Sequence, residues 1–258
     1  LFAIGSVGPF LYLLSPSFRQ SVELFNYPPE WFPRHWYLGN YGFVLHQTSY
    51  LRWAGNTFIV ATAVTLITVA IDSMAAYAFA RMTFPGRKPL FILVIATMMI
   101  PTAAVLAPLY LMATKLGLLN TYEGMIFPMV AAPIGVFMMR QFIGTLPEGL
   151  VEAARLDGAS EWKIFVRIVL PLMKSPMVVL GVFVFMQQWV NFLWPLVVTT
   201  SDDMRTLTVG ISLLQGQFVT NWGVIAAAAA MTMVPITIVF LALQRWFVQA
   251  SMAGALKQ

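Results

Sequence analysis

The chain has no cysteine and only two histidines among its 258 residues. Without thiols, disulfide bonds and thiolate metal sites are excluded. His35 and His46 lie in one hydrophilic segment without the spacing of metal ligands, so we expect solvated side chains and no metal site. A Gly-x-x-x-x-Gly-Lys-Ser/Thr loop, which cradles nucleotide phosphates, is also missing from the sequence. The chain is therefore not expected to hydrolyse ATP unaided.

Charged residues are scarce as well: they make up 10% of the chain, against 59% hydrophobic residues. A soluble domain is about 25% charged, so this chain has too few charges to cover a soluble fold. The net charge of +5 does not make nucleic acid the expected partner, because in so apolar a chain the distribution of charge over the loops matters more than its sum. The sequence predicts a membrane protein in contact with lipid.

Apolar segments long enough to cross a bilayer, about 20 residues each, follow one another along the chain. They are uninterrupted and do not alternate with period two, so helices are favoured. We predict an all-α polytopic fold of one domain, 1–258, with six transmembrane helices, of which the first is cut at its N-terminal end. The predicted spans cover about 1–14, 55–80, 89–114, 122–144, 173–199 and 222–248.

Lysine and arginine are distributed unevenly over the segments between these spans. One set of segments carries ten of these residues and the other set carries five. Because cytoplasmic loops are the richer in Lys and Arg, we expect segment 145–171 and the C-terminus in the cytoplasm. Segments 15–54, 115–121 and 200–221 are then expected on the outer side.

Segment 145–171 is polar and charged, although it lies between two apolar spans. Pro147 and Glu148 suit the first turn of a helix, and Gly158 suits its end. Ser160 is a suitable cap for a second helix. We therefore predict two short helices that meet at a glycine corner and lie parallel to the membrane surface. The pattern is compatible both with an amphipathic connector on lipid and with a docking element for a soluble partner.

The residues of this loop resemble the EAA signature of binding-protein-dependent ABC importer permeases. Glu152, Ala153 and Ala154 are followed by three residues, Gly158, nine residues and then the run Ile-Val-Leu-Pro of 168–171. Every signature position is present. The resemblance covers nearly the whole chain and points to the MalG-like permeases of the carbohydrate-uptake class, which have the MetI-like fold of type I importers.

Other segments carry the same resemblance: 75–81, 84–87, 117–122 and 192–196. Two positions depart from the pattern of the subfamily. Val190 separates Trp189 from Asn191, which are often consecutive in the family, and Gln258 replaces the usual C-terminal glycine. The first departure lies where a substrate contact would be transferred from the family.

The resemblance implies that the loop forms a coupling helix, which docks in a cleft of an ATP-binding subunit. The implied partners are a second homologous permease subunit, two ATP-binding subunits and an extracytoplasmic solute-binding protein, in the lipid of a prokaryotic cytoplasmic (inner) membrane. The chain itself would be non-catalytic and bind no cofactor, with ATP and Mg on the ATPase subunits. The implied coupling residues are Glu152, Ala153, Ala154, Asp157 and Gly158.

The fifth predicted span carries amide and indole side chains around its centre, where polar groups are costly and are candidates for function. Amides and indole rings suit a neutral polyol, through hydrogen bonds and through stacking on the C–H face of a sugar. Hydrogen bonding between helices is the structural alternative, since the partner permease can hold most substrate contacts. The candidate pathway residues are Gln187, Gln188, Trp189, Asn191 and Trp194.

Three further questions remain open at the level of sequence. Asp72 is an intramembrane carboxylate, interpreted either as a hydrogen-bonded structural acid or as the coupling acid of an ion-coupled secondary carrier. A glycerol-phosphate ester is the alternative substrate, although no spanning segment has Lys or Arg near mid-depth. Segment 200–221 is interpreted as a contact for the binding protein or as an ordinary exposed loop.

Overall fold

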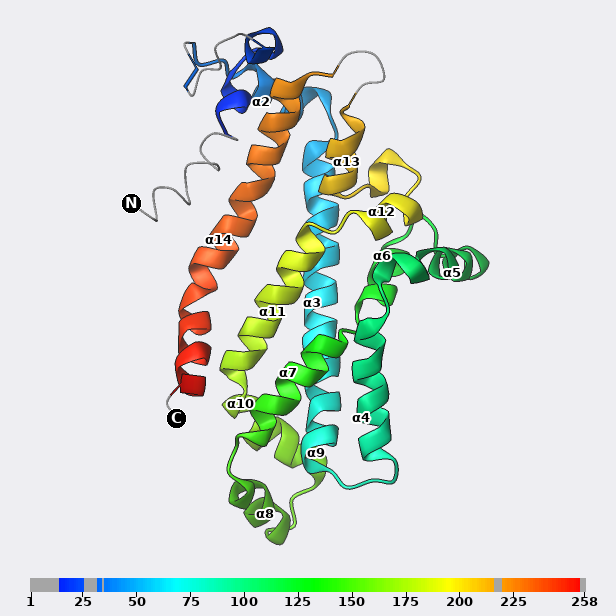
Figure 1. Cartoon of the computed structure of the whole chain (residues 1–258), viewed down its shortest axis with the longest axis vertical. Coiled ribbons are helices and arrows are strands. Elements are labelled where there is room, and N and C mark those ends of the chain that lie inside the picture. The colour runs from blue at the N-terminus through cyan, green and yellow to red at the C-terminus, as the bar shows by residue number, and fades with distance from the viewer. Residues whose placement is uncertain (1–13, 26–31, 34, 216–219, 256–258) are drawn as a thin grey trace. The chain divides into compact units, whose positions relative to one another are not determined.

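The computed structural model describes residues 14–25, 32–33, 35–215 and 220–255 (Figure 1). All regular elements in these ranges are helices, so the all-α prediction is confirmed for them. The chain divides into two compact units. Unit 1 comprises 1–59, 119–121 and 189–238, and unit 2 comprises 60–118, 122–188 and 239–258.

Unit 1 is built from short helices and the ends of three long ones. Its elements are η1 (Ser15–Phe18), η2 (Ser21–Phe25), α2 (Gly39–Gln47), the first turns of α3 (Tyr50–Arg81), α12 (Leu193–Val198), η6 (Asp202–Met204), α13 (Leu207–Leu213) and the start of α14 (Trp222–Ala255). Helix α13 packs tightly on α3, because a Cβ placed at Gly210 would lie 2.2 Å from the Trp53 ring. The Asn40 side chain donates hydrogen bonds to two carbonyl oxygens of the 15–19 segment.

Unit 2 contains the rest of α3 and most of the remaining helices. Its elements are α4 (Arg87–Ala96), η3 (Thr97–Met99), α5 (Thr102–Lys115), α6 (Tyr122–Ile126), η4 (Phe127–Met129), α7 (Pro133–Gly144), α8 (Glu148–Leu156), α9 (Glu161–Ile164), the π-helix η5 (Phe165–Val169), α10 (Leu170–Leu172) and α11 (Lys174–Trp189), of which only Trp189 belongs to unit 1. In Figure 1, α8 lies beyond the ends of α7 and α9.

Two described helices are each long and apolar enough to cross a membrane: α3 and the Trp222–Gln244 part of α14. Three more spans qualify only as bent pairs. The bends are 100° between α4–η3 and α5, 47° between α6–η4 and α7, and 79° between the run Glu161–Leu172 and α11. The described residues therefore hold up to five spans. Residues 1–13 of the first predicted span lie outside the described residues, so six spans remain a prediction.

None of the spans predicted over 89–114, 122–144 and 173–199 is one continuous helix, because each is broken. Two breaks are at prolines, which donate no backbone hydrogen bond and keep the preceding residue extended. Pro101 precedes α5 and Pro133 begins α7. The helix over 173–199 ends at Trp189, and after three non-helical residues a new one begins at Leu193.

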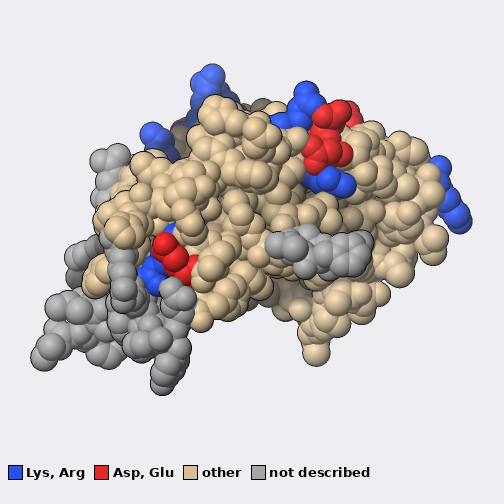
Figure 2. All heavy atoms as spheres, turned by 90° about the horizontal axis from the view of Figure 1, so that it is seen from above, with Lys and Arg blue, Asp and Glu red and all other residues tan. Residues whose placement is uncertain are grey.

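Charge is sparse on the surface too. Figure 2 shows a face that is mostly uncharged, on which the few Asp and Glu side chains lie beside Lys or Arg side chains. Many large apolar side chains are exposed along the helices, including Leu66, Ile92 and Leu111, each at least 60% exposed. A contiguous apolar surface of this kind is normally covered by lipid or by another subunit.

Candidate functional site

The elbow formed by 147–160 has the local structure that the sequence predicts. Pro147 precedes α8, and the chain turns at Gly158, whose φ of 76° is a left-handed conformation that favours glycine. Ser160 caps the next helix, since its Oγ accepts a hydrogen bond from the Lys163 N–H at 3.4 Å. A Cβ placed at Gly158 would meet nothing within 4 Å, so backbone conformation, and not crowding, selects glycine there.

Helix α8 buries one side and exposes the other. Val151 and Ala154 are buried, whereas Glu152 and Ala153 are exposed. The small side chain of Ala154 therefore packs inside unit 2, and of the two implied coupling alanines only Ala153 is exposed. The reason is helical spacing: residues three apart lie on the same side of a helix, so Ala154 follows Val151 inward.

The exposed side of α8 also carries leucines, which the sequence interpretation missed. Leu156 is 89% exposed and Leu150 is 45% exposed. The signal was present in the sequence, because Leu156 lies one helical turn after Glu152 and so follows it outward. Five of the exposed residues are called the α8 face: Leu150, Glu152, Ala153, Leu156 and Asp157.

Charged side chains fix the elbow to the last turns of α3. Arg155 Nε donates to Glu161 Oε1 at 2.7 Å, which joins α8 to α9 across the glycine corner. The other Glu161 oxygen accepts from the Tyr77 hydroxyl at 2.6 Å, and Arg155 Nη2 donates to the carbonyl oxygen of Arg81 at 2.9 Å. Both partners belong to α3, so hydrogen bonds join the elbow directly to the last turns of that helix.

Arg81 makes a second connection. Its guanidinium donates to the carbonyl oxygens of Ile143, at 2.9 Å, and of Leu146. It also lies 3.5 Å from a carboxylate oxygen of Glu148, in the first turn of α8. A cation suits the carbonyl end of α7 and a carboxylate suits the N-terminus of α8. The end of α3 thus holds the exit of α7 and the entry of α8 together.

The predicted pathway residues are distributed over the break that follows α11. Gln187 is exposed and Gln188 half-buried in unit 2. Trp189 and Trp194 are buried in unit 1, at 3% and 2% exposure. The indole N–H of Trp189 donates to the Thr232 carbonyl oxygen at 3.1 Å, which agrees with the structural alternative for this residue and removes it from the exposed stacking surfaces.

Asn191 lies in the non-helical residues between α11 and α12. Its backbone carbonyl oxygen accepts a hydrogen bond from the Thr208 hydroxyl at 2.7 Å. Interrupted spans are frequent at transport sites, where the freed backbone groups line a pathway. The break therefore keeps Asn191 and Gln187 as candidates, while their contact with substrate stays a prediction.

Asp72 is 1% exposed and lies in unit 2. Its Oδ2 has no hydrogen-bond partner among the described residues, whereas the backbone of Ala132 hydrogen-bonds the carboxyl group. A Cβ placed at Gly135 would lie 2.0 Å from Oδ2, so the glycine makes room for the acid. The arrangement agrees with the interpretation of Asp72 as a structural acid, which belongs to α3 and packs against the start of α7.

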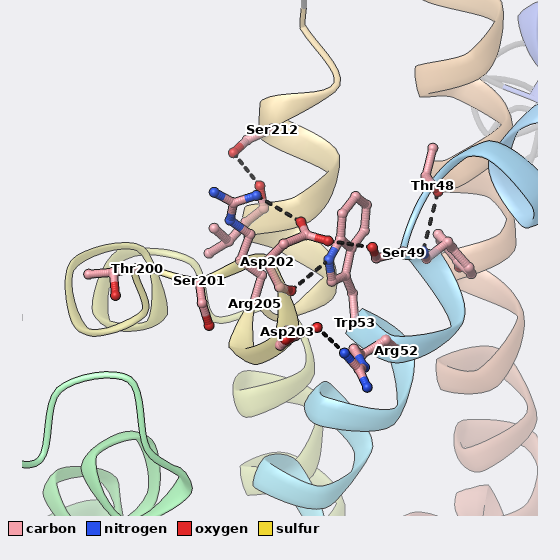
Figure 3. A network of polar contacts seen from close by, with 12 residues as sticks. Thr48, Ser49, Arg52, Trp53, Thr200, Ser201, Asp202, Asp203, Arg205 and Ser212 are labelled. Atoms are coloured by element: carbon pink, nitrogen blue, oxygen red, sulfur yellow. Dashed lines mark hydrogen bonds and ion pairs between the residues drawn. The ribbon is translucent and has the colours of Figure 1, made fainter.

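A second polar network in unit 1 joins the segment 200–205 to the first turns of α3 (Figure 3). Asp202 accepts hydrogen bonds from the Ser49 hydroxyl and, at 2.8 Å, from Arg205 Nη1. Arg52 pairs with the neighbouring Asp203. These contacts keep the pKa of Asp202 below its ordinary value, through the Ser49 hydrogen bond first and the Arg205 cation next.

Backbone carbonyls of the same segment are also satisfied by α3. Asn56 Nδ2 donates to the carbonyl oxygens of Asp203 and Arg205 at 2.7 and 2.8 Å, and the Trp53 indole donates to that of Asp202 at 3.3 Å. An open cavity of about 260 Å³ lies beside this network, with Gln47, Ser49, Arg205 and Leu213 in its lining. Segment 200–205 is therefore held on α3 by side-chain and backbone hydrogen bonds. Residues 216–219 of the predicted outer segment lie outside the described residues.

Comparison with known proteins identifies the family. The model of the family described as "Binding-protein-dependent transport system inner membrane component" matches residues 72–251. The chain belongs to this family. The match includes the elbow, the break after α11 and Asp72, so these three parts of the candidate site lie within the family domain.

Curated relatives agree with this assignment. The arabinooligosaccharides transport system permease protein AraQ of Halalkalibacterium halodurans is 37% identical over 258 residues, covering 99% of this chain and 92% of that protein. The sn-glycerol-3-phosphate transport system permease protein UgpE of Pectobacterium atrosepticum is 35% identical over 196 residues, covering 75% of this chain and 70% of that protein. This family member is thus an ABC transporter permease and a membrane component.

A solved structure shares the fold. It is the crystal structure of a bacterial ABC transporter involved in the import of the acidic polysaccharide alginate, and one of its chains matches with a TM-score of 0.85 and 21% identity. The match covers 95% of this chain and 92% of that chain. The predicted MetI-like permease fold is confirmed.

Proposed function

We propose that this chain is a transmembrane permease subunit of an ATP-driven importer, and that it forms half of a translocation pathway for a sugar or related polyol. It crosses the inner membrane six times, with the elbow and the C-terminus in the cytoplasm. It pairs with a second homologous permease, receives solute from an extracytoplasmic binding protein and binds two ATPase subunits. ATP and Mg are held by those subunits, and this chain contributes no catalytic residue.

The observation that carries the proposal is the combination of an outward α8 face with an inward salt-bridge network. The α8 face offers two leucines, Leu150 and Leu156, beside the carboxylates of Glu152 and Asp157. An apolar anchor with a charged rim is the composition of a protein–protein contact. The bonds of Arg155 and Glu161 to α3 give a docked partner a rigid connection to a membrane-spanning helix.

The substrate class rests on relatives and on charge. The relatives named above transport arabinooligosaccharides and sn-glycerol 3-phosphate according to their names. A phosphate ester needs a cation in the pathway, but Arg52, Arg81, Lys115 and Lys174 lie in the first or last turn of their helices. Arg140, four residues before the end of α7, donates to the Phe79 carbonyl oxygen and lies over the Phe91 ring. This distribution supports a neutral solute, recognised by Gln187, Gln188 and Asn191 on the exposed or non-helical side of the break.

Reconstitution tests the proposal. The full chain is placed in proteoliposomes with and without its companion permease and ATPase subunits, and uptake of labelled arabino-oligosaccharides and of glycerol 3-phosphate is measured with the binding protein outside. We expect uptake of the neutral sugar only in the complete complex and only with ATP at the ATPase side.

Two outcomes would contradict the proposal. Accumulation by the chain alone, driven by an ion gradient and lost in Asp72→Asn, would establish the carrier alternative. Faster uptake of glycerol 3-phosphate than of any neutral sugar by the complete complex would replace the substrate class and leave the importer role intact.

A further inference from the structure

Unit 2 contains an apolar groove that the transport proposal does not use. It lies between α3 and the α10–α11 region, and its volume is about 570 Å³, within the range of roughly 300–1,000 Å³ that is typical of ligand sites. Its lining residues are Thr65, Leu66, Val69, Leu170, Pro171, Lys174, Met177, Val178 and Gly181. We call this set the α3–α11 groove.

The groove offers hydrocarbon contacts and almost no hydrogen bonds. Thr65 donates its hydroxyl to the Ala61 carbonyl oxygen at 2.6 Å, so its hydrogen-bonding proton is used within α3. Pro171 has no backbone N–H. A Cβ placed at Gly181 would make ordinary van der Waals contact with Thr65 and Val69, at 3.6 and 3.7 Å, so the absence of a side chain there leaves the groove about one methyl group wider. A sugar or a peptide backbone would lose its hydrogen bonds in such a groove, whereas an acyl chain would lose none.

One cation completes the lining. Lys174 is exposed and is the first residue of α11, where the helix dipole is positive and disfavours a cation. None of the ion pairs found among the described residues includes Lys174. The same holds for Lys163 and Arg167, which are exposed on the helical run that leads to the groove. The local excess of positive charge therefore favours the binding of an anion from outside the chain.

We propose that the α3–α11 groove binds one anionic phospholipid, with an acyl chain along the apolar lining and the headgroup phosphate on the Lys174 ammonium. The apolar lining suits the acyl chain, and Lys174 suits the headgroup, because basic pockets between membrane helices bind anionic headgroups. A single lysine near the surface favours an anionic over a zwitterionic lipid by about fivefold. The bound lipid would contact both α3, to which the elbow is hydrogen-bonded, and α11, which ends at the break after Trp189.

Native mass spectrometry of the full chain tests this site. The chain in mild detergent is titrated with dioleoylphosphatidylglycerol or dioleoylphosphatidylcholine, and bound lipid is counted. We expect about fivefold preference for the anionic lipid, loss of that preference in Lys174→Ala, and its retention in Lys174→Arg. Lys115→Ala is the matched control, since Lys115 is also exposed at the end of an apolar helix, α5, but does not line the groove.

Filling the groove separates the acyl chain from the headgroup. Gly181→Leu is expected to reduce binding of both lipids, while Gly181→Ala, which adds only an ordinary contact, keeps them. Excess inorganic phosphate is expected not to displace the lipid. Unchanged phosphatidylglycerol binding in both Lys174→Ala and Gly181→Leu would overturn the proposal. So would displacement by phosphate, or loss of the companion permease from the Gly181→Leu complex without loss of lipid.

Discussion

The first and the last turns of α3 carry polar networks of opposite design. At the first turns, in unit 1, Asp202 and Asp203 are paired with Ser49, Arg205 and Arg52. At the last turns, in unit 2, Arg155 and Glu161 are paired and bond to α3, and the α8 face with its two leucines is left exposed.

This difference distinguishes a segment that is stabilised within the chain, 200–205, from a surface that is available to a partner, the α8 face. The network at the first turns satisfies both its side chains and its backbone carbonyls within unit 1, so the segment 200–205 is ordered without a partner. The elbow pairs Arg155 with Glu161 but leaves Leu156 89% exposed. An apolar side chain exposed on a rigid polar element is the usual mark of a binding surface, and the elbow is the region where a variant should separate assembly from function.

The largest effect is expected from Gly158→Trp. A non-glycine residue at φ 76° is strained, by about 1–2 kcal/mol, and the indole would stand between α8 and a docked ATPase subunit. Uptake should be abolished while the complex still assembles or nearly so. Proteoliposome uptake and subunit composition after affinity purification measure the two properties.

Gly149→Ala is the matched control, because Gly149 lies within α8 and a Cβ there meets nothing within 4 Å. Alanine is favoured over glycine inside a helix, so uptake should stay at the wild-type rate. Normal transport by Gly158→Trp would remove the elbow from the mechanism.

The second prediction concerns the apolar anchor. Leu156→Glu replaces the more exposed of the two leucines of the α8 face with a charge. Loss of a central anchor costs about 2 kcal/mol, or roughly 30-fold in affinity, so binding of the ATPase subunit should weaken by that factor. Leu116→Glu, at a leucine that is 66% exposed outside the elbow, is the control. Equal affinities of the two variants, measured by titration of labelled ATPase subunit, would contradict a contact at Leu156.

The third prediction addresses the connection between the elbow and α3. Glu161→Gln keeps an acceptor for Tyr77 but removes the ion pair with Arg155. Because the side chains of the pair are 40% and 37% exposed, the loss should be about 0.5–1 kcal/mol, seen as a melting temperature about 1–4 °C lower. Uptake should fall by several-fold although ATPase binding is retained.

Glu123→Gln is the control for this change, since Glu123 is exposed and belongs to none of the ion pairs found among the described residues. A fall in ATPase binding that parallels the fall in uptake would mean that Glu161 acts on the docking contact itself and not on transmission to α3.

Much of the elbow was predictable from sequence because its determinants are local. Pro147, Gly158 and Ser160 each fix the backbone within three residues of themselves, and the helix–glycine–helix structure follows from them. The inward turn of Ala154 was also contained in the three-residue spacing from Val151. The signature drew attention to the alanine pair as a unit, while helical geometry separates its members.

The breaks of the spans depend on less local causes. The helices before and after Pro101 are together long and apolar enough for one span, as are those before and after Pro133, so apolar runs mark membrane depth and not helix continuity. The break after Trp189 has no proline. Its hydrogen bonds are made with distant residues: Asn191 accepts from Thr208, 17 positions away, and Trp189 donates to Thr232, 43 positions away. Contacts of that range cannot be derived from the composition of one span.

The smallest effect is expected at the first turns of α3, from Asp202→Asn. The pKa of Asp202 is lowered in the folded chain, mainly by the Ser49 hydrogen bond. A carboxylate with a lowered pKa stabilises the fold above its ordinary pKa, and this contribution disappears as the pH falls through the folded-state value. At pH 7 the variant should therefore melt below the wild type, and the difference should vanish in acid.

The magnitude should be about 1–2 °C, because the Asp202 side chain is 46% exposed and solvent screens its pairing. Asp203→Asn is the matched control: that residue and Arg52 are 71% and 59% exposed, so no measurable change is expected. Thermal melts from pH 7 to pH 3 distinguish the two. A difference for Asp202→Asn that is independent of pH would show that the hydrogen bonds of segment 200–205, and not the charge of Asp202, hold this segment on α3.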